Sequence, residues 1–185
     1  MKQDKNRVCP VELAGSLDSK IRKWIQNPQK ILMPHVKKGM TVLDVGCGPG
    51  YFTIEMAKLV GINGKVIAAD LQEGMLQIVK AKIQNTLLEK IITTVKCDKD
   101  KINVSEKVDF ILCFYMVHEV PDKEKFFSEL KNGLNKDGCV LIVEPSFHVT
   151  KNDFNLMMKI IKNTGFISLP VSQTFLNRTA LIKLN

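Results

Sequence analysis

The sequence predicts an α/β fold in which a doubly wound, mostly parallel sheet carries helices on both faces. Beyond residue 40, short β-branched runs alternate with longer amphipathic stretches. Strands and helices that alternate in this order are joined by right-handed crossovers, which make the strands parallel. The chain has 185 residues, of which 45% are hydrophobic, and this is enough to bury a core. We therefore expect a single domain over residues 1–185.

The expected strands are short runs rich in Val, Ile and Leu. They are TVLDVG (41–46), KVIAAD (65–70), IITTVKC (91–97), VDFILCFY (108–115) and CVLIVEP (139–145). The first of them reads as a buried strand. Two further runs of β-type composition close the chain: FISLPVSQ (166–173) and TALIKLN (179–185).

The expected helices have apolar residues at a spacing of three and four. They cover residues 51–61, 72–89, 123–134 and 152–163. Gly61 would end the first helix. In the second helix, the apolar face runs from Met75 to Leu87. Asp122 would cap the start of the third helix, and the fourth is centred on Phe154 and Met157.

A glycine-rich turn follows the first strand, where sheets of this kind bind their ligands. Gly46, Gly48 and Gly50 would let a ligand approach the backbone closely, and the helix that follows offers free N–H groups. Asp44 ends the first strand, and Asp70 ends the second, 20 residues after Gly50. An acid at that spacing is the usual partner of ribose hydroxyls. These signals together indicate a ligand that contains adenosine.

The spacing of the glycines distinguishes between two kinds of adenosine ligand. The third glycine comes one residue earlier than in the GxGxxG pattern of dinucleotide sites. The order DVGCGPG resembles the class I S-adenosylmethionine-dependent methyltransferases, in the small-molecule branch of ubiquinone/menaquinone type. The likeness covers roughly residues 35–185, and its other motifs follow in family order: AADLQEGML (68–76), KCDKD (96–100), FYMVHEVPD (114–122), LKNGLNKDGCVLIVEP (130–145) and GF…TALIKL (165–184).

The resemblance implies a fold, a cofactor and a set of residues that bind it. The fold would be a Rossmann-like sheet of seven strands in the order 3-2-1-4-5-7-6, with strand 7 antiparallel, over residues 41–185. The cofactor would be S-adenosylmethionine. Gly46, Gly48 and Gly50 would line its methionine part, and Asp44 would orient the loop or bind the amino group through water.

The remaining cofactor contacts come from the ends of strands two, three and four. By resemblance, Asp70 would accept hydrogen bonds from both ribose hydroxyls, and Leu71 and Met75 would border the adenine. Asp98 would meet the adenine amino group. The full expected set for cofactor binding is Asp44, Gly46, Cys47, Gly48, Gly50, Asp70, Leu71, Met75, Cys97, Asp98 and Phe114.

Methyl transfer from a sulfonium is an in-line displacement, so the protein mainly aligns the two reactants and excludes water. A general base is needed only if the acceptor must lose a proton. The catalytic candidates lie in the loop after strand four: Tyr115, His118 and Glu119. His118 is the expected base; the alternative is that His118 and Glu119 only shape the loop. Metal-dependent methyltransferases of the catechol type carry an Asp-Asn pair at the end of a strand. Strand five here ends in Glu144 and Pro145, so no metal is expected.

Residues 1–40 carry an excess of positive charge. They hold nine Lys or Arg against three Asp or Glu, so they supply +6 of the net charge of +8. We expect this segment to be helical around Ile21, Ile25 and Leu32, and to form a lid or contact the substrate; the alternative is plain packing on the sheet. The basic charge would suit an anionic small molecule or a lipid surface, or it is a solvated face. Nucleic acid is not the expected substrate, although the basic segment leaves it open.

Location and two competing functions complete the expectations. The N-terminus lacks an apolar signal core, and no apolar run approaches a membrane span, so a cytoplasmic protein is expected. The five scattered cysteines argue against a disulfide framework or a zinc site. A nicotinamide-dependent reductase is the competing enzyme. That class would have a Tyr-x-x-x-Lys signature, but Glu119 lies four residues after Tyr115 in place of the lysine. The competing non-enzyme is a methyltransferase-like binding subunit.

Overall fold

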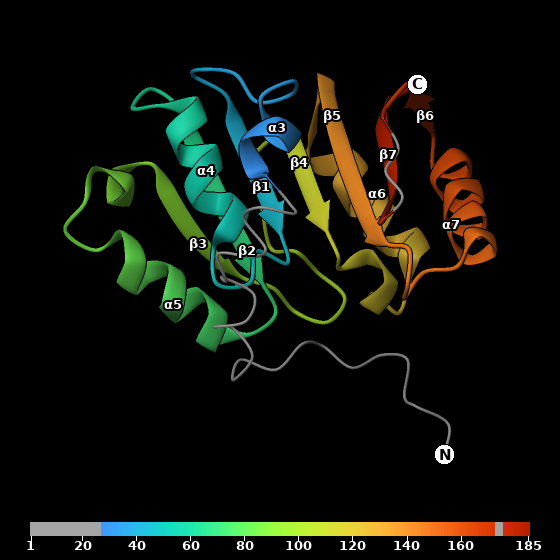
Figure 1. The fold of residues 1–185 in the computed structure, drawn as a ribbon, viewed down its shortest axis with the longest axis horizontal. Helices are drawn as coiled ribbons and strands as arrows, with labels where there is room; N and C mark the ends of the chain where they lie inside the picture. Colours follow the sequence, from blue (N-terminus) through green and yellow to red (C-terminus); the bar gives the residue numbers. More distant parts are fainter. Residues whose placement is uncertain (1–26, 173–175) are drawn as a thin grey trace.

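The structure, a computed structural model, describes residues 27–172 and 176–185. It contains a seven-stranded sheet in the order β3-β2-β1-β4-β5-β7-β6 (Figure 1). The strands are β1 (Thr41–Val45), β2 (Lys65–Asp70), β3 (Ile92–Lys96), β4 (Val108–Phe114), β5 (Leu134–Pro145), β6 (Phe166–Leu169) and β7 (Asn177–Leu184). The first five are parallel, and β7 is antiparallel to both of its neighbours. The expected fold and strand order are confirmed.

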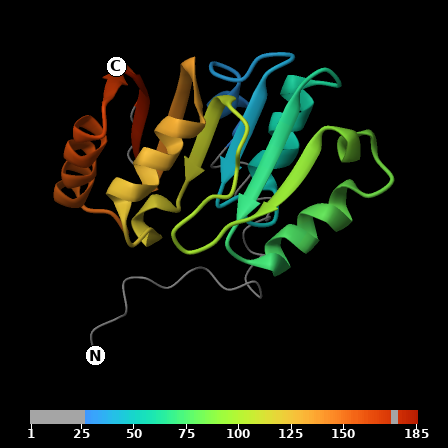
Figure 2. The same cartoon turned by 180° about the vertical axis from the view of Figure 1, so that it is seen from behind.

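Helices cover both faces of this sheet. They are α3 (Pro28–Leu32), α4 (Tyr51–Val60), α5 (Glu73–Ile83), α6 (Lys123–Gly133) and α7 (Lys151–Asn163). The first three pack on one face and the last two on the other (Figures 1 and 2). Along β1, Val42 belongs to the core of the first face, whereas Leu43 and Val45 belong to the core of the second. The strand is apolar along most of its length because both of its faces are covered.

Three expected elements have clearly different bounds in the structure, one of them being the strand expected over 166–173, which covers only Phe166–Leu169. The helix expected over residues 72–89 ends at Ile83, because Gln84 takes a non-helical ψ of 132° and Asn85 takes a left-handed conformation with φ 60°. A separate 3₁₀ turn, η2 (Leu87–Lys90), follows, and Leu87 is 72% exposed rather than part of the apolar face. Strand β5 begins at Leu134 instead of residue 139, and its pairing with β4 shifts register between Val108 and Phe110. Such a β-bulge accommodates extra residues on one strand.

The other helix starts and ends agree closely with expectation. Gly61 caps the end of α4 with φ 69°, and the Asp122 side chain accepts a hydrogen bond from Lys125 N at the start of α6. The expected lid falls mostly outside the described residues. Ile21 and Ile25 are not described, and Leu32 is buried in α3. Within the described ranges, no helix combines the length and the hydrophobicity of a membrane span.

Helix α7 begins with a capping box, which gives a test of its stability. The Thr150 hydroxyl accepts a hydrogen bond from Asp153 N, and the Asp153 carboxylate accepts one from Thr150 N. Thr150→Ala should lower the free energy of unfolding by about 1 kcal/mol, because the cap is lost. Urea denaturation followed by circular dichroism measures this. Asn152→Ala, at an exposed position of the same turn, is the control and should change stability by less than about 0.5 kcal/mol.

Candidate functional site

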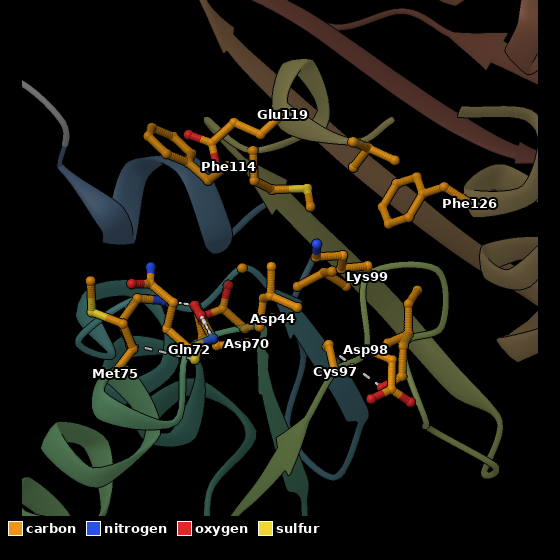
Figure 3. A pocket seen from close by; sticks show the side chains of 18 of the residues that line it. Asp44, Asp70, Gln72, Met75, Cys97, Asp98, Lys99, Phe114, Glu119 and Phe126 are labelled. Atoms are coloured by element: carbon orange, nitrogen blue, oxygen red, sulfur yellow. Dashed lines mark hydrogen bonds between the residues drawn. The ribbon is translucent and has the colours of Figure 1, made fainter. Parts of the chain in front are cut away.

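A cavity of about 230 Å³ opens beyond the carboxyl ends of β1 to β4. Most of its lining comes from the segments that directly follow these strands, as the parallel topology predicts. Figure 3 shows Asp44, Asp70 and Gln72 on one side of the cavity, with Phe114 and Glu119 across from them. The strand ends therefore bring together residues that are far apart in the sequence.

Two of the three glycines in the turn line the cavity, and the third packs against a helix. Gly46, Gly48 and Gly50 all have left-handed φ angles, of 69°, 53° and 84°. Gly46 and Gly48 line the cavity. A Cβ on Gly48 would have no atom within 4 Å, whereas one on Gly50 would lie 3.0 Å from Val79 Cγ2 of α5. Gly50 lies outside the lining, at the start of α4, where only glycine combines this φ with close helix packing.

Asp70 clamps the glycine turn to the end of β2. Its Oδ2 accepts a hydrogen bond from Gly48 N and its Oδ1 accepts one from Gln72 N, both at 2.8 Å. The residue is buried and lines the cavity. Burial raises the pKa of Asp70, although the two N–H donors and Lys96 act in the opposite direction. The carboxylate is thus fixed at the cavity wall, and each oxygen keeps lone-pair capacity for a ligand.

Asp44 joins the end of β1 to the first turn of α4. It is 2% exposed, and its Oδ2 accepts a hydrogen bond from Thr53 Oγ1 at 2.6 Å. The loop-orienting role that the resemblance implied for Asp44 stays a prediction. Sequence reasoning missed Thr53. The available signal was a polar residue beside Phe52 and Met56 on an otherwise apolar helix face.

Both cysteines expected at the site line the cavity as neutral thiols. Burial raises the pKa of Cys47 well above its ordinary value, and it raises the pKa of Cys97 to about 12. A thiol needs a lowered pKa to act as a nucleophile near neutral pH. Cys47 and Cys97 are therefore small lining residues, and neither is activated for covalent chemistry.

Four aromatic side chains form a continuous wall of the cavity: Tyr51, Phe52, Phe114 and Tyr115. Ring centroids are 5.2 Å apart for Tyr51 and Phe52, 4.3 Å for Phe52 and Phe114, and 4.4 Å for Phe114 and Tyr115. Tyr115 has φ 59°, and its hydroxyl donates to Asn177 Oδ1 at the start of β7. Sequence reasoning identified Phe114 and Tyr115 as site candidates, but not Phe52. This wall could contact a planar ligand.

The other residues expected on the β2–β3 side also line the cavity, and the charge of the lining is mainly negative. Leu71, Met75 and Asp98 all line the cavity. The Asp98 carboxylate also accepts a hydrogen bond from Asn103 Nδ2 at 3.0 Å. The lining contains seven Asp or Glu residues and three Lys. Such a lining favours a cation over an anion. It gives no support to the expected anionic acceptor, an expectation drawn from residues 1–40, most of which lie outside the described part of the chain.

The three catalytic candidates differ in whether they reach the cavity. Tyr115 and Glu119 line the cavity, whereas His118 is outside its lining. His118 lies behind Glu119 in the 3₁₀ turn η3 (Val117–Glu119), with its Nε2 4.0 Å from Glu119 Oε1. Its Nδ1 lies 2.5 Å from Oε2 of the fully buried Glu144. Residues 27–172 and 176–185 contain no group of three His, Cys, Asp or Glu suited to a metal ion.

Comparisons with known proteins agree with this geometry. A family model described as "Methyltransferase domain" matches residues 36–174. Demethylmenaquinone methyltransferase of Lactobacillus johnsonii is 34% identical over 112 residues, which are 60% of this chain and 46% of that protein. Ubiquinone/menaquinone biosynthesis C-methyltransferase UbiE of Idiomarina loihiensis is 29% identical over 110 residues, or 59% of this chain and 44% of that protein. The chain spans about half the length of these curated relatives.

Solved structures with the same architecture cover almost the whole chain. A SAM dependent methyltransferase from Aquifex aeolicus superposes with a TM-score of 0.85 and 26% identity, covering 95% of this chain and 98% of that one. A TehB-like SAM-dependent methyltransferase from Corynebacterium glutamicum gives a TM-score of 0.70 over 94% of this chain and 93% of that one. Its identity is 16%, so this second likeness bears on the fold alone.

Proposed function

We propose that this chain, which belongs to the class I S-adenosylmethionine-dependent methyltransferases, transfers a methyl group from S-adenosylmethionine to a small-molecule acceptor. The observation that carries the proposal is the buried Asp70 carboxylate, bonded to Gly48 N at the wall of an acid-rich cavity. When bound, the cofactor supplies a methyl group on a sulfonium with a good leaving group. The residues of the chain would hold the two reactants in line and exclude water.

The cavity suits this cofactor in its access to the backbone and in its charge. Gly48 has open space at its Cα, so a ligand can reach the backbone there. The excess of carboxylates suits a ligand with a sulfonium and an ammonium group. In the proposal, Asp70 binds the ribose hydroxyls, Leu71 and Met75 flank the adenine, and Asp98 meets its amino group. Phe114 approaches the amino end of the cofactor through its backbone.

Four observations bear on the acceptor and the setting of the reaction. The names of the two curated relatives point to a quinone-type acceptor, and the aromatic wall around Phe52 and Phe114 would contact a planar ring. We propose a cytoplasmic location, which is supported by free thiols at the four described cysteines. We also propose metal-independent transfer, because the Glu144 carboxylate at the end of β5 is occupied by Val117 N and His118.

The proposal is tested by cofactor binding and by methyl transfer. Isothermal titration of the full chain with S-adenosylmethionine should give a Kd in the micromolar range, about −8 kcal/mol. NADPH is the control ligand and should not bind, because the family match disfavours the reductase. Transfer of labelled methyl to reduced demethylmenaquinone should follow. Absence of S-adenosylmethionine binding would refute the proposal, and binding without transfer to this or any other tested acceptor would favour a non-catalytic subunit.

A further inference from the structure

Three ionisable side chains form a chain that leads from the cavity into the protein interior. Glu119 lines the cavity, His118 lies behind it, and Glu144 is fully buried behind His118. The residues come from two elements, the turn η3 after β4 and the end of β5. Because β4 and β5 are parallel neighbours, their carboxyl ends bring these groups together at one edge of the site.

Glu144 determines which nitrogen of His118 carries the proton. Its Oε1 accepts a hydrogen bond from Val117 N at 2.9 Å, which fixes the carboxylate. Its Oε2 lies 2.5 Å from His118 Nδ1. Since a carboxylate accepts hydrogen bonds, this contact favours the tautomer with the proton on Nδ1. The lone pair of Nε2 is then available toward Glu119.

Glu119 connects this nitrogen with the cavity. Its Oε1 lies 4.0 Å from His118 Nε2, a separation that a side-chain rotation or one bridging water would close. In the part of the chain that the structure describes, no residue donates a hydrogen bond to its carboxylate. Figure 3 shows Glu119 beside Phe114, across the cavity from Asp70. An acceptor in the cavity would therefore meet Glu119 first and not His118.

We propose that Glu119 and His118 form a proton relay for the methyl acceptor, with Glu144 as the positioning residue. The inference rests on the proposed function and adds that the acceptor loses a proton on methylation. The Glu119 carboxylate takes the proton that the acceptor loses in the reaction that bonds it to the methyl carbon, while the sulfur keeps the electron pair of the broken bond. The proton then passes to His118 Nε2, which gives an imidazolium between two carboxylates.

The charges around the two relay groups support this direction of transfer. Burial lowers the pKa of His118, but the hydrogen bond and charge of Glu144, together with Glu119, outweigh it, so this pKa lies above its ordinary value. Lys123 of α6 opposes the increase, and the His148 ring stacks on His118 at 5.8 Å. The pKa of Glu119 is raised by burial and by the charges of Glu144 and Asp70, while His118 lowers it. A carboxylate with a raised pKa is a stronger base near neutral pH.

The test is a histidine titration by ¹⁵N NMR on the full chain without ligands. The chain has three histidines, and His35→Gln and His148→Gln assign their signals. When His118 is neutral, its proton should be on Nδ1. The pKa of His118 should lie above the ordinary histidine value of 6.5. Glu144→Gln should lower this pKa by about one unit or more, because a charged partner is replaced by a neutral one. Glu119→Gln should lower it by a smaller amount. Glu124→Gln, at an exposed glutamate of α6, should leave it unchanged.

Kinetics supply a second readout. The relay needs neutral His118, so methyl transfer to reduced demethylmenaquinone should lose kcat as the pH falls through the pKa of His118. Glu144→Gln should move that limb to lower pH, with little change in KM. A proton on Nε2 in wild type, or an unchanged His118 pKa in Glu119→Gln, would overturn the relay. If Glu144→Gln does not fold, the tautomer of His118 in the wild type and the pKa of His118 in Glu119→Gln still test the relay. Failure of the proposed function would appear separately, as absent S-adenosylmethionine binding by the wild type.

Discussion

Asp70→Ala is expected to weaken S-adenosylmethionine binding by about 100-fold or more. A carboxylate that bonds two ribose hydroxyls contributes two charged hydrogen bonds of about 1.5–3 kcal/mol each, and 2.7 kcal/mol corresponds to a factor of 100 in Kd. The substitution also leaves Gly48 N and Gln72 N without their shared acceptor. The glycine turn then loses its clamp to β2, which adds to the loss of affinity.

Isothermal titration measures this effect, and two variants separate its components. Asp70→Asn keeps the shape and one acceptor oxygen but loses the charge, so its affinity should lie between those of wild type and Asp70→Ala. Asp137→Ala removes an exposed aspartate outside the cavity and should bind as wild type does. A folded Asp70→Ala protein that binds within threefold of wild type would rule out the ribose role of Asp70.

Gly46→Ala is expected to lower both stability and cofactor affinity. An alanine at φ 69° is strained by about 1–2 kcal/mol. Its Cβ would also lie 3.0 Å from Cβ and Cγ of Met116. The contact would push the glycine turn away from the loop after β4, and both of these segments line the cavity. We expect a total destabilisation of about 2–3 kcal/mol and a Kd about tenfold higher or more.

Gly39→Ala is a matched control for this prediction. Gly39 also has a positive φ, of 81°, but its added Cβ would meet no atom within 4 Å, and the residue lies outside the cavity. It should lose only the strain energy, about 1 kcal/mol, and keep its affinity. Urea denaturation and isothermal titration of both variants give the two comparisons. Equal losses of stability, or equal affinities, would show that the contact with Met116 has no effect on the site.

The alternation of strands and helices was readable in the sequence because burial imposes it. Helix α4 carries its apolar residues at helical spacing, and Gly61 ends it where expected. The strand order, by contrast, came from the resemblance to a family and not from the spacing of residues. The end of α5 was predicted wrongly, because Leu87 continues the periodic pattern while Asn85 has already left the helical conformation. Periodicity alone does not detect such a single-residue departure.

The cofactor side of the site was more predictable than the acceptor side. The glycine turn and Asp70 can be recognised from a few neighbouring residues. The turn directly follows β1, and Asp70 is the last residue of β2. His118 was the expected base, but the structure places it behind Glu119 and against Glu144. That arrangement depends on the pairing of β4 with β5, across 26 residues of sequence between His118 and Glu144. No local pattern contains it.

The sequence by itself therefore determined the class of fold and the place of the cavity, because apolar periodicity and glycine turns act over a few residues. Only the tertiary structure decided which side chains share the cavity. Gly50 supports α5 through Val79 instead of lining the cavity. Phe52, a residue of the helix expected over 51–61, joins Phe114 in the cavity wall. These contacts follow from the packing of separate helices, strands and loops against one another. Such packing leaves no periodic pattern in the sequence.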